Sequence, residues 1–150
     1  MSRRSFPVSW FEIHRDARAL GWRLSEKGEW KGMLAVTKGG MVPACIVAKE
    51  LQIGNIQTLC ISTYAERDQQ SETHKIYYAP TLEDGGQGWL IVDDLVDSGN
   101  TFRIAREMYP NAHFAAVYAK PEGLDTVDSF VTEVSQDTWI DFPWEGDPEN

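Results

Sequence analysis

Residues 90–101 read LIVDDLVDSGNT, a buried strand that leads directly into a loop of acids and small residues. The run LIV is continuously apolar, which is typical of a parallel strand covered on both faces. Asp93 and Asp94 follow it, and Asp97 comes shortly after. Adjacent carboxylates repel each other, and Mg²⁺ or a set of sugar hydroxyls would satisfy them. For the two acids alone, an ordinary solvated turn is the simpler interpretation.

The loop after Asp97 changes that balance because it is built from small and hydroxylated residues. Residues 98–101 (Ser-Gly-Asn-Thr) lead into a predicted helix over 101–109. Backbone N–H groups at such a helix start bind phosphate. An ordinary helix cap by Ser98 or Thr101 uses the same geometry, so the two interpretations are compatible. Acids and loop together predict a ligand that carries a phosphate, hydroxyl groups and a metal ion.

Apolar runs and turn signals elsewhere predict an α/β fold. Four more strands are expected, at GMLAV (32–36), NIQTLCIS (55–62), HFAAVYA (113–119) and DSFVTEV (128–134). Further helices are expected over residues 9–24, with a capping box of Ser9 and Glu12, and from Pro43 to Leu51. This alternation indicates a mostly parallel central sheet flanked by helices. Ligands bind such sheets at the carboxyl ends of the strands, where TKGG (37–40) also lies.

Length and composition suit one folded domain over residues 1–150. A net charge of −9 disfavours binding to nucleic acid or to an anionic membrane surface. Cys45 and Cys60 lie inside apolar runs, so we expect two buried free thiols. Residues 63–88 are polar and rich in glycine at their end, which predicts a hairpin or flap. We expect a cytoplasmic protein, since nothing in the sequence indicates membrane association.

The motif LIVDDLVDSGNT resembles the phosphoribosyl-diphosphate-binding motif of the type I phosphoribosyltransferases. In that family an apolar strand leads into two acids, two apolar residues, a third acid and a small loop. Four further segments resemble, in order, the bacterial xanthine-guanine members of the family: EWKGMLAVTKGGMVPACIVAKELQI, LCISTY, REMYPNAHFAAVYAKPEG and SQDTWIDFPW. The resemblance covers most of residues 8–144 and implies the family's fold, with a flexible flap at about 63–88 and a small hood at about 121–150.

The resemblance also implies an activity. It is that of a purine salvage enzyme, a pentosyltransferase that moves the 5-phosphoribosyl group of phosphoribosyl diphosphate to N9 of a 6-oxopurine. The base would be guanine, xanthine or hypoxanthine, the products GMP, XMP or IMP together with pyrophosphate, and the cofactor Mg²⁺. Because the family is typically tetrameric, a homotetramer or homodimer is expected.

For phosphoribosyl diphosphate, the resemblance assigns roles residue by residue. Asp93 and Asp94 match acids that handle the ribose hydroxyls and Mg²⁺. The loop 37–40 matches the pyrophosphate loop, which in the family carries a non-proline cis peptide before its basic residue, and 98–101 match the 5′-phosphate cradle. The full predicted set is Thr37, Lys38, Gly39, Gly40, Asp93, Asp94, Leu95, Val96, Asp97, Ser98, Gly99, Asn100 and Thr101.

For the purine, four residues match. Asp97 matches the catalytic carboxylate that exchanges a proton with purine N7, and Lys120 matches the lysine that donates to the 6-oxo group. Trp139 matches the aromatic that stacks on the base, and Ile140 a source of backbone contacts to its edge. Without the resemblance, a solvated lysine at a strand end would be the simpler interpretation of Lys120. Trp144 has no counterpart role, so packing is its expected function.

Departures from the family pattern define open questions. Lys38 stands where the family usually has Arg, which keeps the charge but loses the bidentate fork. A flap arginine falls on Gln70, with Arg67 as the nearest substitute, and Asn100 replaces a Gly. The sequence ends with WEGDPEN (144–150), before an apolar tail seen in relatives, which leaves the oligomeric state open.

Three alternatives compete with this interpretation. One is a catalytically silent member of the fold that senses nucleotides, and a second is a hypoxanthine-preferring relative. The third is a receiver-like or phosphatase-like domain with acids around Mg²⁺, but such domains draw their acids from separate strands. Here all three acids lie within one short stretch, Asp93 to Asp97.

Overall fold

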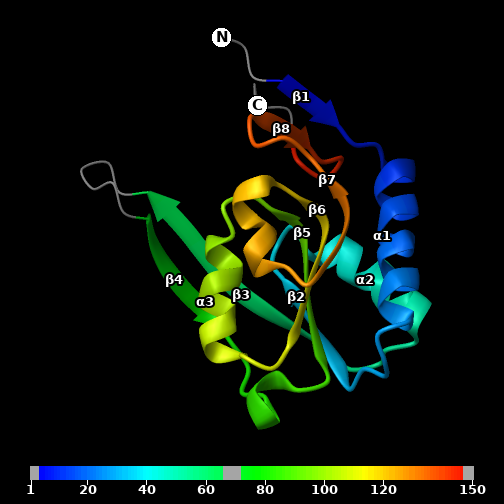
Figure 1. The fold of residues 1–150 in the computed structure, drawn as a ribbon, viewed down its shortest axis with the longest axis vertical. Helices are drawn as coiled ribbons and strands as arrows, with labels where there is room; N and C mark the ends of the chain where they lie inside the picture. The colour runs from blue at the N-terminus through cyan, green and yellow to red at the C-terminus, as the bar shows by residue number, and fades with distance from the viewer. Residues whose placement is uncertain (1–3, 66–71, 147–150) are drawn as a thin grey trace.

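The structure is a computed structural model that describes residues 4–65 and 72–146 of the chain (Figure 1). Its strands are β1 Arg4–Pro7, β2 Gly32–Val36, β3 Ile56–Ala65, β4 Glu72–Tyr78, β5 Trp89–Val96, β6 His113–Ala119, β7 Ser129–Glu133 and β8 Thr138–Asp141. Its helices are α1 Trp10–Ser25, α2 Met41–Leu51 and α3 Asn100–Met108, with 3₁₀ turns η1 Glu83–Gly86 and η2 Pro121–Thr126. The predicted α/β class is confirmed.

A six-stranded sheet in the order β4-β3-β2-β5-β6-β7 forms the centre of the fold. All of its neighbouring strands pair in parallel except β3 and β4, which form an antiparallel hairpin within residues 56–78. The hairpin occupies the first part of the predicted flap. β5 lies between β2 and β6, so its carboxyl end stands at the middle of the sheet edge.

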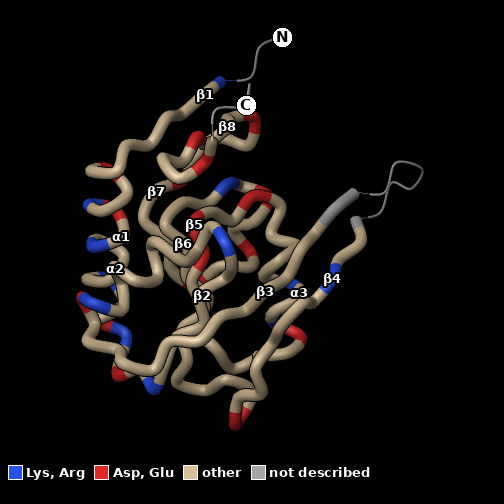
Figure 2. Tube along the Cα trace, turned by 180° about the vertical axis from the view of Figure 1, so that it is seen from behind, with Lys and Arg blue, Asp and Glu red and all other residues tan. Residues whose placement is uncertain are grey.

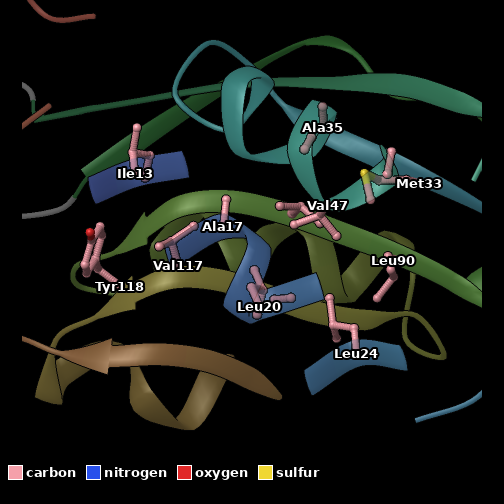
Figure 3. Packing of buried hydrophobic residues seen from close by; sticks show 14 of the residues in the cluster. Ile13, Ala17, Leu20, Leu24, Met33, Ala35, Val47, Leu90, Val117 and Tyr118 are labelled. Atoms are coloured by element: carbon pink, nitrogen blue, oxygen red, sulfur yellow. The ribbon is translucent and has the colours of Figure 1, made fainter. Parts of the chain in front are cut away.

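Two hydrophobic layers cover the two faces of this sheet. Alternate residues of a strand point to opposite faces, so Leu90 and Val92 pack with α1 and α2, whereas Ile91 packs with α3. Figure 3 shows the first layer, in which side chains of α1 and α2 meet those of β2, β5 and β6. The strands are apolar on both sides because both faces are buried.

The capping box at the start of α1 is present as predicted. Glu12 N–H donates to the Ser9 hydroxyl at 3.1 Å, and Ser9 N–H donates to the Glu12 carboxylate at 3.1 Å. Helix α2 begins at Met41, two residues before the predicted Pro43, because the glycine loop before it already has helical backbone at Gly40.

The strands β1 and β8 were not predicted, and they pair in parallel as a separate two-stranded sheet. Each is only four residues long and neither is a continuous apolar run, so neither gives a strand signal. The pairing joins the two ends of the chain above the main sheet (Figure 1). Trp144 stacks on Phe142 with ring centroids 4.7 Å apart, and it also contacts Trp10. Its predicted packing function is confirmed.

The predicted burial of both cysteines is wrong, although both thiols are free. Cys45 is exposed because α2 buries the stripe of Pro43, Ala44, Val47 and Ala48, and position 45 lies off that stripe. Cys60 is half-buried: its neighbours Leu59 and Ile61 point into the layer under α3, so its own side chain points to the opposite face of β3.

Basic and acidic positions are interspersed along α1 and α2 (Figure 2). Within the part of the chain that the structure describes, no helix is long and apolar enough to cross a membrane.

His113, at the start of β6, makes the stability of the fold dependent on pH. Burial lowers the pKa of His113, and the nearby Asp128 carboxylate opposes this only in part. The unfolded chain therefore binds a proton at about pH 6.5 that the folded chain resists, and stability from this group is lost as pH falls through that value.

We predict that His113→Gln reduces the loss of Tm between about pH 7.5 and about pH 5.5 relative to the wild type. The matched control is His14→Gln, because His14 is exposed on α1. Thermal melts at a series of pH values measure the effect. If His113→Gln and His14→Gln both keep the wild-type pH slope, His113 does not carry the effect.

Candidate active site

The paired acids lie inside β5 rather than after it, which corrects the predicted strand end. β5 continues to Val96 because Leu95 and Val96 pair with the end of β6. Asp94 N–H donates to the Asp93 carboxylate at 2.8 Å. Both acids are half-buried at the carboxyl end of the central strand.

In the part of the chain that the structure describes, the negative charges of Asp93 and Asp94 are not balanced by a recorded cationic partner. Burial raises the pKa of Asp93 well above its ordinary value, and the adjacent Asp94 carboxylate raises it further. Burial also raises the pKa of Asp94, against the lowering effect of hydrogen bonds from Asp93 and Leu95. Among residues 4–65 and 72–146, no lysine or arginine forms an ion pair with either acid. Added positive charge at this place would stabilise both carboxylates.

The loop 37–40 lies directly against these acids. The Thr37–Lys38 peptide bond is cis, as the resemblance implies, and the Lys38 side chain is exposed. A Cβ atom on Gly39 would lie 2.4 Å from the Asp94 Oδ2 atom, so only glycine allows this approach. The predicted pyrophosphate loop and the predicted metal acids therefore form one site.

The predicted phosphate cradle surrounds a cavity of about 130 Å³. Its lining residues are Thr63, Asp93, Leu95, Val96, Asp97, Ser98, Gly99, Asn100, Thr101 and Phe102. Gly99 has φ 90°, a left-handed conformation that a side chain rarely adopts, and α3 starts at the next residue. The N–H groups at the start of α3 therefore lie at a cavity large enough for a phosphate.

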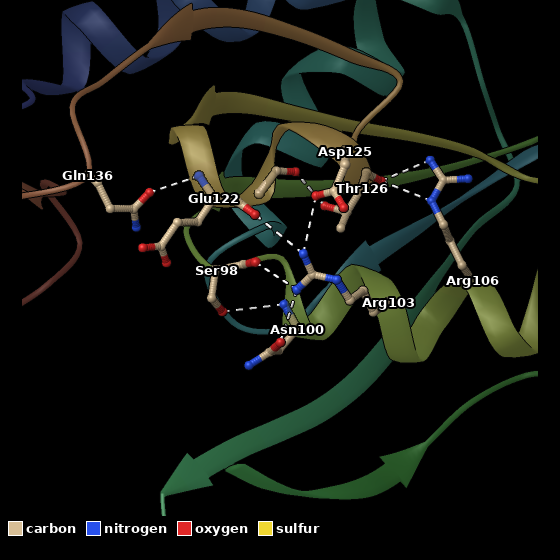
Figure 4. Close-up of polar contacts among 9 residues, drawn as sticks. Ser98, Asn100, Arg103, Arg106, Glu122, Asp125, Thr126 and Gln136 are labelled. Carbon is tan, nitrogen blue, oxygen red and sulfur yellow. Dashed lines mark hydrogen bonds and ion pairs between the residues drawn. The ribbon is translucent and has the colours of Figure 1, made fainter. Parts of the chain in front are cut away.

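Arg103 holds the loop 98–101 in place through hydrogen bonds (Figure 4). Sequence reasoning did not predict these contacts. Its guanidinium donates to the Ser98 carbonyl at 2.8 Å and to the Asn100 side chain at 3.1 Å. It also reaches η2, where it donates to the Glu122 carbonyl and to Asp125. Asn100, which replaces a family glycine, thus takes part in this link.

A second cavity of about 380 Å³ adjoins the first. It is lined by Asp97, Lys120, Gln136, Asp137, Thr138 and Trp139. The Lys120 ammonium lies 3.3 Å from Asp97 Oδ2, and the residue is only 4% exposed, so it is not a solvated strand-end lysine. The Trp139 side chain is half exposed and offers a ring face, whereas Ile140 is buried and can offer only backbone groups.

Among the acids in the described part of the chain, Asp97 alone lines both cavities. The structure therefore brings the predicted residues of loop 93–101 together with Lys120 and Trp139, although β5 and β8 belong to different sheets. Gln136 was missed, since a glutamine in a polar turn gives no sequence signal. The alternatives Gln70 and Arg67 lie outside the described residues.

The acids fit a magnesium ion. Mg²⁺ is usually held by one or two carboxylates together with substrate phosphates. Within the described residues, no group of three or more His, Cys, Asp and Glu side chains could hold a metal alone. Asp93 and Asp94 supply two adjacent carboxyl groups whose ionised forms a cation would stabilise against burial and mutual repulsion, and a phosphate ligand in the adjoining cradle would supply further oxygens.

Comparison with known families identifies the class of this protein. Residues 9–149 match the family described as "Phosphoribosyl transferase domain". The chain therefore belongs to the phosphoribosyltransferase family.

Individual proteins of this family are similar to the chain in sequence or in structure. A xanthine-guanine phosphoribosyltransferase of Nitratidesulfovibrio vulgaris (strain DP4) is 57% identical over 97% of this chain and 87% of its own length. A xanthine-guanine phosphoribosyltransferase of Desulfotalea psychrophila is 51% identical over 95% of this chain and 88% of its own. The crystal structure of a purine phosphoribosyltransferase from Pyrococcus horikoshii superposes with a TM-score of 0.80 at 25% identity, covering 96% of this chain and 95% of that chain.

We predict that Gly39→Ala weakens the binding of phosphoribosyl diphosphate in the presence of Mg²⁺. The added Cβ would collide with the Asp94 carboxylate and displace the acid or the loop. A misplacement of about 1 Å in a catalytic site can lower the reaction rate about 100-fold, and we expect the Kd for phosphoribosyl diphosphate to rise by a comparable factor. Isothermal titration calorimetry measures the change in Kd.

The matched control is Gly54→Ala, because a Cβ on Gly54 has no neighbour within 4 Å. It is expected to bind as the wild type does. Wild-type affinity in Gly39→Ala would show that the close approach of loop and acid has no role in binding.

Proposed function

We propose that this protein transfers the 5-phosphoribosyl group from phosphoribosyl diphosphate to N9 of a 6-oxopurine and releases pyrophosphate. The bases are guanine and xanthine, with hypoxanthine as a further substrate, and the products are the nucleoside monophosphates of purine salvage. The observation that carries the proposal is the position of Asp97 between a phosphate-sized cavity and a larger cavity with an aromatic wall. The names of the relatives support the choice of base.

Phosphoribosyl diphosphate would be bound by backbone N–H groups more than by side chains. Its 5′-phosphate would accept hydrogen bonds from the N–H groups of residues 98–101 at the start of α3. Its pyrophosphate would lie on the loop 37–40, where Lys38 is the exposed cation. A lysine in place of the family's arginine provides charge without a bidentate fork, so we expect weaker pyrophosphate contacts.

On the base side, Lys120 discriminates by hydrogen-bond chemistry. Its ammonium can only donate, and it is buried beside the second cavity. The 6-oxo group of guanine, xanthine or hypoxanthine accepts such a bond, whereas the 6-amino group of adenine would leave the donor unpaired. The half-exposed Trp139 ring stacks on the base, and the backbone near Ile140 contacts its edge.

The reaction is a displacement at the anomeric carbon. Purine N9 forms the new bond as the bond to pyrophosphate breaks, and Asp97 accepts the proton that leaves N7. Bound Mg²⁺, held by Asp93 and Asp94, would neutralise charge on the departing pyrophosphate. The single domain would use the β3–β4 hairpin as a flap and residues after Lys120 as a hood that together exclude water.

Assembly and location are further parts of the proposal. We propose a homotetramer or homodimer without a nucleic-acid partner, in agreement with the net charge of −9. A cytoplasmic location stays a prediction.

Asp97→Asn is expected to lower kcat by about 10²- to 10⁴-fold, because the amide cannot accept the N7 proton. Binding of phosphoribosyl diphosphate should change little, since the cradle and the loop 37–40 remain. Steady-state rates and calorimetric titration measure the two quantities. The same change at the exposed turn residue Asp84, Asp84→Asn, is the control. Wild-type turnover by Asp97→Asn would exclude Asp97 as the base.

A further inference from the structure

Both carboxylate oxygens of Asp97 are held by side chains from the base cavity. Oδ2 lies 3.3 Å from the Lys120 ammonium, and Oδ1 accepts a hydrogen bond from Gln136 Nε2 at 2.7 Å. The proposed reaction gives Lys120 a partner on the base but gives Gln136 none. Gln136 lines the same cavity and makes the shorter of the two contacts.

The Gln136 amide has a fixed orientation. Its Oε1 accepts from the Glu122 N–H at 3.0 Å, a contact drawn in Figure 4. A reversed amide would place NH₂ against that N–H and a carbonyl oxygen against the Asp97 carboxylate, so both contacts would become repulsive. Gln136 is therefore held as a donor toward Asp97.

The backbone on both sides of Gln136 is also anchored. Thr138 N–H donates to the Ser135 carbonyl at 3.1 Å, and the Ser135 hydroxyl contacts Asp137 and Thr138. On the opposite side, Gly123 N–H donates to the Lys120 carbonyl at 3.0 Å. The turn that carries Gln136 and the turn that carries Glu122 are both closed locally, so the bridge between them does not depend on a bound ligand.

We propose that Gln136 is a positioning residue that aims the Asp97 carboxylate into the base cavity. This inference rests on the proposed function. The Asp97 side chain is 55% exposed, so it would sample several rotamers without this contact. When Lys120 turns to the 6-oxo group of a bound base, Gln136 remains as the donor that holds Asp97 for the N7 proton. The contact also joins the hood to the phosphate loop.

The charged groups around Asp97 do not provide the hydrogen bond that Gln136 donates. Lys120 approaches from the end of β6, and Arg103 is engaged with backbone and side-chain oxygens of the cradle and η2. Asp93 and Asp137 line the adjoining cavities, but the recorded hydrogen bonds of their carboxyl groups go elsewhere, to the Asp94 N–H and to the Ser135 hydroxyl. Among the residues that the structure describes, Gln136 is the one neutral side chain recorded as donating to the Asp97 carboxylate.

The test compares Gln136→Met, which removes the donor at similar size, with Gln136→Glu. We expect kcat to fall about 10- to 100-fold in Gln136→Met, the effect of losing a hydrogen bond to a charged group, with KM for phosphoribosyl diphosphate within about twofold of the wild type. Gln57→Glu is the control, because Gln57 lies at the opposite end of the sheet and contacts only Asn55 among the recorded side-chain bonds.

Gln136→Glu adds a readout that a merely structural role would not change. While the introduced carboxyl group is ionised it would repel the Asp97 carboxylate, whereas at lower pH the protonated carboxyl group would again donate a hydrogen bond to Asp97. Its kcat relative to the wild type should therefore rise as pH falls, while the ratio for Gln136→Met stays constant.

Each outcome decides one question. If the wild-type chain forms no nucleotide, the proposed function fails and the role of Gln136 falls with it. If the wild type is active and Gln136→Met keeps its kcat, only the role of Gln136 is overturned. Parallel pH profiles for both Gln136 variants, with a raised KM and a lowered Tm, would show that Gln136 merely supports the fold of the hood.

Discussion

The parallel pairing of β5 between β2 and β6 is the constraint on which the site depends. It brings the loop 37–40 after β2, the loop 97–101 after β5 and Lys120 after β6 to one edge of the sheet. Each of these segments follows the carboxyl end of its strand, where a parallel sheet leaves room for a ligand. The same pairing buries the middle of each strand in the hydrophobic core, so the predicted site residues lie directly beside that core.

The three acids along this edge have different surroundings, and the difference suits them to two different functions. Asp93 and Asp94 have pKa values raised by burial and lie where a cation would stabilise them. Asp97 instead has a cation and an amide as partners, so its orientation is determined by protein groups. Three acids within one short stretch thus divide into a pair suited to a metal and hydroxyls and one suited to a proton.

Sequence reasoning found the parts that have strong local signals. The strands β2 and β6 coincide with their predictions because a buried parallel strand is a continuous apolar run. The end of β5 was misplaced because its acids look like a loop, and β1 and β8 were missed because their pairing joins distant, short segments.

The loops of the site were also predicted, whereas the side chains that support them were not. Arg103 and Gln136 are polar residues without a motif, and the Gln136–Asp97 bond joins positions 39 residues apart. Only the fold shows that these positions meet. The burial of Lys120 beside Gln136 and Trp139 is likewise visible only in the fold, because these positions are distant in the sequence.

Nucleotide formation by the wild-type chain tests the central claim most directly. The protein would be incubated with phosphoribosyl diphosphate, Mg²⁺ and either guanine, xanthine, hypoxanthine or adenine, and the nucleoside monophosphate would be quantified. We predict products from guanine and xanthine, with adenine used at least about 100-fold less efficiently because it cannot accept from Lys120. No product from any base, or equal use of adenine, would contradict the account.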